Sequence, residues 1–330
     1  MATAGSPTSP LLSQALAMAG DGVSGATLQN PDLTGVLPEA MRGEDLEKMN
    51  PAHRQTVLRH ELLKDLSFKP TANIAELKAI DNAGDEKTLV TLDRRVGDDY
   101  KHQLGLVFAA SQNRPDRMSE MFVQQTDILS FFGLNAQLGY VRKPWTMVLI
   151  DAVLAAAIDV HTQFKHALPV LRPVELSPQI NPVIQTPSHS SFPSGHATEA
   201  FVVAQLLTRL RELAEDSLAK SNLLQHAVRI AQNRTVAGVH YPVDNMAGSM
   251  LGTALADYFS AISQPGVAPV AVPKRSFKPS AEKDHLKNFT LTIYTELLNR
   301  MATKLQIAPT NQTKKQPLNW IWSQARSEWP

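Results

Sequence analysis

The chain has 330 residues, of which 43% are hydrophobic and 19% are charged, so its composition is that of a globular protein with a sizeable core. The formal net charge of +1 argues against a general nucleic-acid-binding protein, because such proteins normally carry a strong basic excess. The absence of cysteine excludes disulfides, thiolate catalysis and zinc–thiolate sites.

Neither a secretory signal nor a membrane span is evident in the sequence. No basic residue precedes Arg42, so the apolar run 10–19 lacks the charged segment that begins a signal peptide. The two most apolar internal runs, 146–160 and 239–255, fall short of twenty clean apolar residues because aspartates interrupt them: Asp151, Asp159 and Asp244. We therefore expect a soluble, cytoplasmic protein without a membrane span.

Residues 1–95 form the first predicted segment, an N-terminal arm and cap of unknown function. Residues 1–37 are rich in Ala, Ser, Gly and Thr, which is typical of a flexible arm. The stretch 51–66 predicts a helix, because a proline opens it and its apolar residues follow at helical spacing. Residues 87–95 alternate weakly and fit either a short strand or part of a loop-rich cap.

Residues 96–265 form the second predicted segment, a catalytic domain built as a helical bundle. Apolar residues three and four apart predict helices over 100–111, 117–132, 142–167, 194–213, 223–237 and 242–262. The stretch 172–193 contains five prolines and predicts an extended loop. The fold class that we expect is mainly α, with a loop-rich N-terminal region and a C-terminal extension.

Residues 266–330 form that C-terminal extension. A Pro-rich linker over 267–279 precedes an amphipathic helix predicted over 286–305. Three of the four tryptophans lie in the last eleven residues, at Trp320, Trp322 and Trp329. Such a cluster predicts that the tail docks onto the body of the protein or onto a second subunit, which leaves a homo-oligomer open.

Cations gather around one predicted helix start, Ser194–Gly195. A helix start offers free backbone N–H groups and the positive end of the helix dipole, and Gly195 has no Cβ to keep an anion away. Taken singly, Ser194 is a helix cap, Lys165 and Arg234 neutralise helix ends, and Arg172 is a surface turn residue. Their joint occurrence around one helix start indicates an oxyanion site.

Two histidines accompany these cations. Asp244 follows His240 by one helical turn, so its carboxylate could accept a hydrogen bond from the imidazole and leave the other ring nitrogen free as a nucleophile or ligand. His196 lies beside the predicted oxyanion site and is the natural proton donor to a departing oxygen. The remaining histidines share no pattern and are interpreted as surface or structural residues, among them His53, His60, His102, His161, His166, His226 and His285.

Written as patterns, these residues are K-x6-R-P, P-S-G-H and R-x5-H-x3-D between Lys165 and Asp244. The three patterns resemble the motifs of the superfamily that joins type 2 phosphatidic acid phosphatases, bacterial acid phosphatases and vanadium-dependent haloperoxidases. The serine usual before the third-motif arginine is Asn233 here, a change that we expect to matter little.

The resemblance implies a role for each motif residue. Lys165, Arg172, Ser194, the Gly195 amide and Arg234 would hold the oxyanion. His240 would bond axially to phosphorus in a phosphatase or to vanadium in a haloperoxidase, Asp244 would orient His240, and His196 would act as acid and base.

The motifs do not choose the reaction, since vanadate and a phosphoryl transition state share one shape. A haloperoxidase is favoured by the expected solubility, by the missing signal peptide and by His189. This histidine stands seven residues before His196, as in the second motif of bromoperoxidases, where it could tune vanadate or halide binding; as a loop residue it could equally have no role. Short intervals between the motifs favour a phosphatase instead.

Three functions therefore stay open, and the sequence favours the first of them, the haloperoxidase, by a small margin. A haloperoxidase would use vanadate as cofactor and hydrogen peroxide and a halide as substrates, with Lys165 polarising the peroxide. A soluble phosphatase would need no cofactor and would cleave a phosphomonoester through a phosphohistidine at His240. The third possibility is a non-catalytic oxyanion-binding or assembly module, against which the pair His196 and His240 argues.

Overall fold

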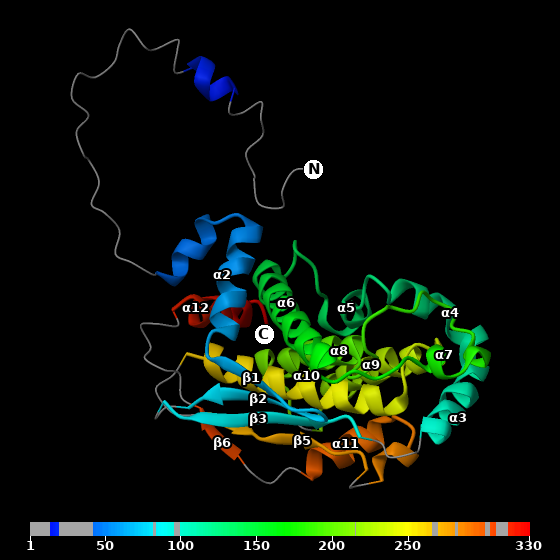
Figure 1. Cartoon of the computed structure of the whole chain (residues 1–330). Coiled ribbons are helices and arrows are strands. Elements are labelled where there is room, and N and C mark those ends of the chain that lie inside the picture. Colours follow the sequence, from blue (N-terminus) through cyan, green and yellow to red (C-terminus); the bar gives the residue numbers. More distant parts are fainter. Residues whose placement is uncertain are drawn as a thin grey trace.

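The computed structural model describes residues 14–19, 42–81, 84–95, 100–214, 216–265, 270–280, 283–300, 304–307 and 316–330. Helices dominate these residues, so the prediction of a mainly α protein is confirmed. Figure 1 shows the helices gathered around α8, α9 and α10, with a small sheet along one side.

The α-helices are α2 (Pro51–Leu63), α3 (Tyr100–Ala110), α4 (Arg114–Val123), α5 (Ser130–Ala136), α6 (Pro144–Ala167), α7 (Pro173–Leu176), α8 (Gly195–Leu210), α9 (Leu218–Val236), α10 (Pro242–Ser263), α11 (Leu291–Asn299) and α12 (Gln316–Ser327). Short 3-10 helices are η2 (Gly43–Lys48), η3 (Ser111–Asn113), η4 (Pro178–Ile180) and η5 (Asp284–Leu286). The strands are β1 (Leu66–Pro70), β2 (Ile74–Ile80), β3 (Glu86–Asp93), β4 (Val270–Pro273), β5 (Arg275–Phe277) and β6 (Lys304–Ile307).

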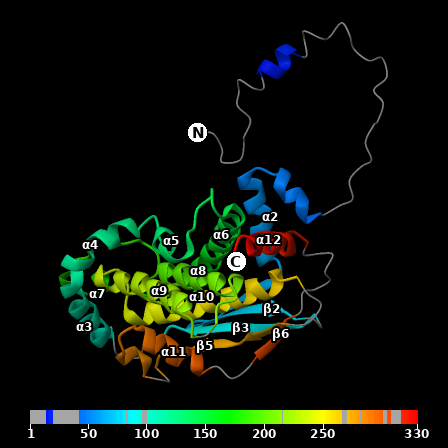
Figure 2. The ribbon, with the colours of Figure 1, turned by 180° about the vertical axis from the view of Figure 1, so that it is seen from behind.

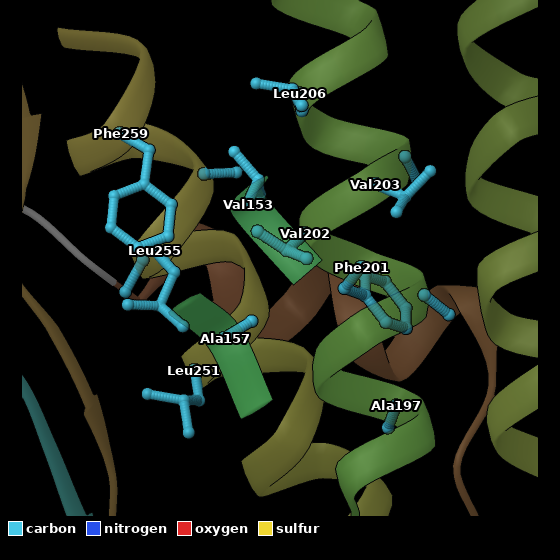
Figure 3. Close-up of a cluster of buried hydrophobic side chains, with 14 of the residues drawn as sticks. Val153, Ala157, Ala197, Phe201, Val202, Val203, Leu206, Leu251, Leu255 and Phe259 are labelled. Atoms are coloured by element: carbon cyan, nitrogen blue, oxygen red, sulfur yellow. The ribbon is translucent and has the colours of Figure 1, made fainter. Parts of the chain in front are cut away.

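The core is formed where α6, α8 and α10 meet. Figure 3 shows side chains from the three helices packed together, among them Val153 of α6, Phe201 and Leu206 of α8, and Leu255 of α10. All four are fully buried. Every residue of α10 is buried, which is the pattern expected of a central helix with neighbours on all sides.

Two glycines let α10 approach α8 closely. A Cβ added at Gly248 would lie 2.5 Å from the Ser194 carbonyl oxygen, and one at Gly252 would lie 2.3 Å from the Thr198 carbonyl oxygen. Both distances are far below van der Waals contact, so no larger residue fits while the helices keep this separation. The start of α8 therefore lies directly against the first half of α10.

A four-stranded sheet covers α10 and joins the two ends of the chain. Its order is β1-β2-β3-β5, with β1, β2 and β3 antiparallel and β5 parallel to β3. Figures 1 and 2 both show this sheet along α10. The expected loop-rich N-terminal region is thus a sheet over residues 66–93, and β5, together with β4, which pairs with β6, occupies the expected linker 267–279. Of these strands, β3 matches the short strand that the weak alternation over 87–95 allowed. The other strands were not predicted from local periodicity, and β5 pairs with β3, which lies far away in the sequence.

The Trp-rich tail docks onto the body through α12. Trp322 and Trp329 are buried, and the Trp329 indole donates a hydrogen bond to Thr146 Oγ1 at 3.1 Å. The Glu328 carboxylate accepts from the backbone N–H groups of Trp145 (2.7 Å) and Thr146 (2.8 Å) at the start of α6. The tail therefore caps α6, satisfying N–H groups that a helix start leaves without partners.

Two predicted helices are shorter than expected. The helix predicted over 117–132 ends at Val123, and α5 begins only at Ser130. The helix predicted over 286–305 is reduced to α11, because the Thr290 hydroxyl caps its start by accepting from Ile293 N, and β6 follows it. Apolar spacing continues across both breaks, so periodicity alone extends the helices too far.

Among the residues described, α6 is the one helix long and apolar enough to cross a membrane, so the expectation that no segment could span one does not hold by length and composition. In its most apolar window 56% of the residues are buried inside the protein. The core helix of a soluble protein has the same length and composition, so α6 fits both a membrane-spanning helix and a core helix.

We expect Gly252→Ala to destabilise the protein by about 2–3 kcal/mol, because its Cβ would meet the α8 backbone. The matched control is Gly105→Ala in α3, where no residue in the described part of the chain lies within 4 Å of the new Cβ. That change should stabilise by about 0.5–1 kcal/mol through helix propensity. Urea unfolding measures both, and equal stability of the two variants would contradict the close α8–α10 contact.

Candidate active site

The starts of α8 and α10 are joined by one backbone hydrogen bond. Ser194 N donates to the Asp244 carbonyl oxygen at 2.9 Å, and the Ser194 hydroxyl caps α8 by accepting from Ala197 N at 3.4 Å. The turn that leads from α9 to His240 passes through Gly238, whose φ of +86° suits glycine at a helix C-terminus. The start of α8 and the turn between α9 and α10, which carries His240, therefore lie side by side.

His240 is held in one tautomer. Its Nε2 lies 3.1 Å from Arg172 Nη1, and a guanidinium can only donate, so Nε2 accepts and carries no proton. Its Nδ1 therefore carries the proton and donates to Asp244 Oδ2 at 3.1 Å. Burial, together with the charges of Arg172 and Lys165, lowers the pKa of His240 well below its usual value, which keeps Nε2 unprotonated at neutral pH.

Asp244 is fully buried and is itself fixed by hydrogen bonds. Its Oδ2 accepts from the Ser191 hydroxyl at 2.5 Å and from Tyr241 N at 2.9 Å, besides His240. Burial raises the pKa of Asp244 to about 6, although these hydrogen bonds oppose the shift. At neutral pH the carboxylate is therefore ionised and can hold the His240 ring.

Arg172 is a rigid cation with 1% exposure. Its guanidinium donates to the carbonyl oxygens of His189 (3.1 Å), Val239 (2.7 Å) and Ser190 (3.3 Å). It also contacts His240 Nε2 and, at 3.1 Å, His189 Nδ1. Its five N–H groups thus have five acceptors, which fixes the plane of the group.

Arg234 is equally buried, but some of its N–H groups have no acceptor among the described residues. Its Nη2 donates to Gln124 Oε1 at 3.0 Å, whereas its Nε and Nη1 are buried and have no partner within the described part of the chain. Burial lowers the pKa of Arg234 to about 10, so it stays charged at neutral pH. Buried N–H groups of a cation without acceptors indicate a place for an anion.

His196 is oriented from α4. Its Nε2 lies 2.9 Å from the carbonyl oxygen of Gln124, so Nε2 donates and Nδ1 is the basic atom of the neutral ring. Burial, together with the charge of Arg234, lowers the pKa of His196 to about 4. The free protein therefore holds this ring neutral, and an anion bound nearby would raise its proton affinity.

Four of the predicted residues line one cavity of about 310 Å³: Arg172, His196, Arg234 and His240. Lys165 and His189 line a neighbouring cavity of about 580 Å³ instead. The Lys165 ammonium donates to the carbonyl oxygens of Ser190 (3.0 Å) and Ser191 (3.3 Å). Burial, with the charge of Arg172, lowers the pKa of Lys165 to about 7.

Gly195 has a second reason for its small size, besides the approach of an anion that the sequence predicts. A Cβ there would lie 3.1 Å from the His161 ring, so Gly195 makes room for this imidazole of α6. The residue most undervalued by the sequence analysis is Asn233, which is fully buried. Its amide donates to Glu120 Oε2 (2.9 Å) and Gln124 Oε1 (3.0 Å), two bonds that a serine hydroxyl could not make together.

Gln124, which holds both Arg234 and His196, had no signal in the sequence, because it lies in the middle of a predicted helix. Ser191, Glu199 and His161 also belong to the surroundings of the site. A helical-spacing argument could have found two of them, since Glu199 follows His196 by one turn and His161 precedes Lys165 by one turn.

The pocket is thus cationic, with two unprotonated imidazole nitrogens, His240 Nε2 and His196 Nδ1, and with guanidinium N–H groups of Arg234 that have no partner among the described residues. This combination fits a tetrahedral oxyanion such as phosphate or vanadate. Residues 146–265 match the model of the PAP2 superfamily, the superfamily that the motifs resemble, and this match supports a phosphatase- or haloperoxidase-type function in general. No curated protein matches the chain.

We expect Asn233→Ser to cost about 1–3 kcal/mol of stability, because Glu120 and Gln124 lose buried hydrogen bonds. Binding of tungstate, a tetrahedral oxyanion that serves as a probe of the site, should weaken as well, since Gln124 then orients Arg234 less firmly. Thermal unfolding and calorimetry measure the two effects. The control is Asn299→Ser at the exposed end of α11, and equal behaviour of both variants would contradict the role of Asn233.

Tungstate binding should also depend on the charge of Lys165. The lowered pKa of about 7 means that the ammonium is present below that pH and lost above it. The affinity for the tungstate dianion should therefore fall by about tenfold between roughly pH 6.5 and 8.5. A tenfold change corresponds to a shift of about one unit in the pKa of Lys165 when the anion binds. In Lys165→Arg, whose charge persists, the fall above pH 7 should disappear. If Lys165→Arg kept the pH profile of the unmodified protein, the charge of Lys165 would not be the cause of the fall in affinity.

Proposed function

We propose that the chain is a vanadate-dependent haloperoxidase-like enzyme that oxidises a halide with hydrogen peroxide. The observation that carries the proposal is the buried His240 Nε2, held unprotonated between Asp244 and Arg172. Vanadate bound there would supply a Lewis acid that activates peroxide without itself changing oxidation state.

The protein residues have separate tasks in this scheme. His240 Nε2 would hold the oxyanion, and Asp244 keeps the lone pair directed by accepting from Nδ1. Arg234 would donate from its unpartnered Nε and Nη1, and the charge of Arg172 would balance the anion. The bond from Arg172 to Nε2 is the one that must give way, because a single lone pair serves one partner. His196 Nδ1 would take up and return a proton.

The rigidity of Arg172 supports a resident cofactor over a product that must leave in each cycle. Five acceptors hold its guanidinium before any ligand binds, so little order remains to be gained on binding. His189 supplies two of these acceptors, so the histidine that resembles the one in bromoperoxidases contacts Arg172 directly. Lys165, at the neighbouring cavity, would polarise the oxidant from its side.

A phosphomonoesterase is the second candidate, and the shape of the cavity favours it. Gln125, Ile184, Gln185 and Pro187 complete its wall and leave about 310 Å³, room for an organic group beside the phosphate. His240 Nε2 would form a bond to phosphorus as the bond to the alcohol oxygen breaks, and a protonated His196 would supply the proton to that oxygen. Water would then release phosphate. A pure binding module would leave the imidazoles of His196 and His240 without a chemical role.

A paired assay separates the candidates. Protein charged with vanadate should brominate an organic dye in the presence of hydrogen peroxide, and vanadate-free protein should leave a generic phosphomonoester intact. Hydrolysis without bromination would refute the haloperoxidase and support the phosphatase. Inactivity in both assays, with vanadate still bound, would support the non-catalytic binding module. His240→Ala should abolish bromination, whereas His60→Ala, an exposed histidine on α2, should not.

A further inference from the structure

A second imidazole–carboxylate pair, largely shielded from solvent, lies beside the active site and outside the three motifs. His161 Nε2 of α6 is 3.2 Å from Glu199 Oε1 of α8, and the side chains are 9% and 20% exposed. The His161 ring also lies against the first turn of α8, since a Cβ at Gly195 would be 3.1 Å from its Cε1. The pair is therefore fixed to the same turn that carries His196.

Glu199 lies on the same side of α8 as His196, three residues further along. The charged and titratable groups that act on the two are His161 and Lys165 from α6, Arg234 from α9 and His240 from α10, whereas α4 contributes the Gln124 carbonyl oxygen. Glu199 thus brings a negative charge into surroundings dominated by cations and imidazoles.

The charges around this carboxylate are consistent with that arrangement. Burial alone would raise its pKa, but the hydrogen bond from His161 and the charge of His196 hold the pKa of Glu199 below its usual value. The carboxylate in turn opposes the lowering of the His196 pKa by burial and Arg234. Glu199 is therefore ionised at neutral pH, where its charge favours the protonated form of His196.

We infer that Glu199 is the electrostatic partner of His196, that His161 holds it in position, and that the pair sets how readily His196 takes up a proton. The inference rests on the proposed acid–base role of His196. The proton moves only between a substrate oxygen and His196 Nδ1, and Glu199 remains a carboxylate that offsets the imidazolium charge beside Arg234. Glu199 and His161 are positioning residues, since they act through His196.

The test follows the titration of the His196 ring by NMR, with its signals assigned from the spectrum of His196→Gln. The measurement is made in the presence of inorganic phosphate, so that a bound anion brings the transition to an accessible pH. In Glu199→Gln the midpoint should fall by about one pH unit, the effect of removing one neighbouring opposite charge. Glu199→Asp, which keeps the charge, should restore most of the shift.

A double variant tests the part played by His161. If His161 acts only through Glu199, His161→Leu should lower the midpoint, and adding it to Glu199→Gln should produce no further change. The control is Glu212→Gln, beyond the far end of α8, which should leave the His196 midpoint unchanged. A midpoint that stays the same in Glu199→Gln would overturn the inference and leave a purely structural ion pair.

The outcome is independent of the proposed reaction, because the ring titrates without turnover. Absence of bromination with the expected NMR shifts would refute the haloperoxidase and keep the pair. Bromination with an unchanged midpoint would keep the haloperoxidase and refute the pair. Thermal unfolding of Glu199→Gln checks that the variant is folded during the titration.

Discussion

The contact on which the structure depends is the close approach of α10 to α8 at Gly248 and Gly252. The backbones of the two helices are in direct contact there, with no side chain between them, so one helix cannot shift along the other without a steric clash. This contact brings Ser194 N within 2.9 Å of the Asp244 carbonyl oxygen and aligns the starts of the two helices. His196 follows one of those starts and His240 precedes the other, so the separation of the two imidazoles is set by helix packing.

Around this contact the protein buries more positive charge than it neutralises. Arg172 is compensated by carbonyl oxygens of the loop before α8 and of the turn after α9, which satisfy its donors without cancelling its charge. Arg234 keeps two N–H groups without acceptors within the described residues. Removing such cations from water costs free energy unless an anion or aligned dipoles replace the solvent. This arrangement supports the proposal that the site binds an oxyanion.

The peripheral elements hold this arrangement from outside. Helix α4 ends at Val123, and the next residue, Gln124, binds Arg234 through its side chain and His196 through its carbonyl oxygen. Asn233 locks Gln124 in turn, so a substitution that the motif comparison treated as neutral joins α4 to the site. At the other end of the bundle, Glu328 caps α6, the helix that carries His161 and Lys165. Residues far outside the motifs thus decide how precisely the motif residues are oriented.

The sequence by itself determined the mainly α class, the resemblance to the PAP2 superfamily and four of the residues that line one cavity, Arg172, His196, Arg234 and His240. Helical periodicity and motif spacing are local properties, and a helix start with flanking cations can be recognised from them. Only the tertiary structure decided that Lys165 opens onto a different cavity from His240, that Gly195 makes room for His161, and that short strands from both ends of the chain form one sheet. These features depend on contacts between segments far apart in the sequence, whose geometry is fixed by packing and leaves no local pattern.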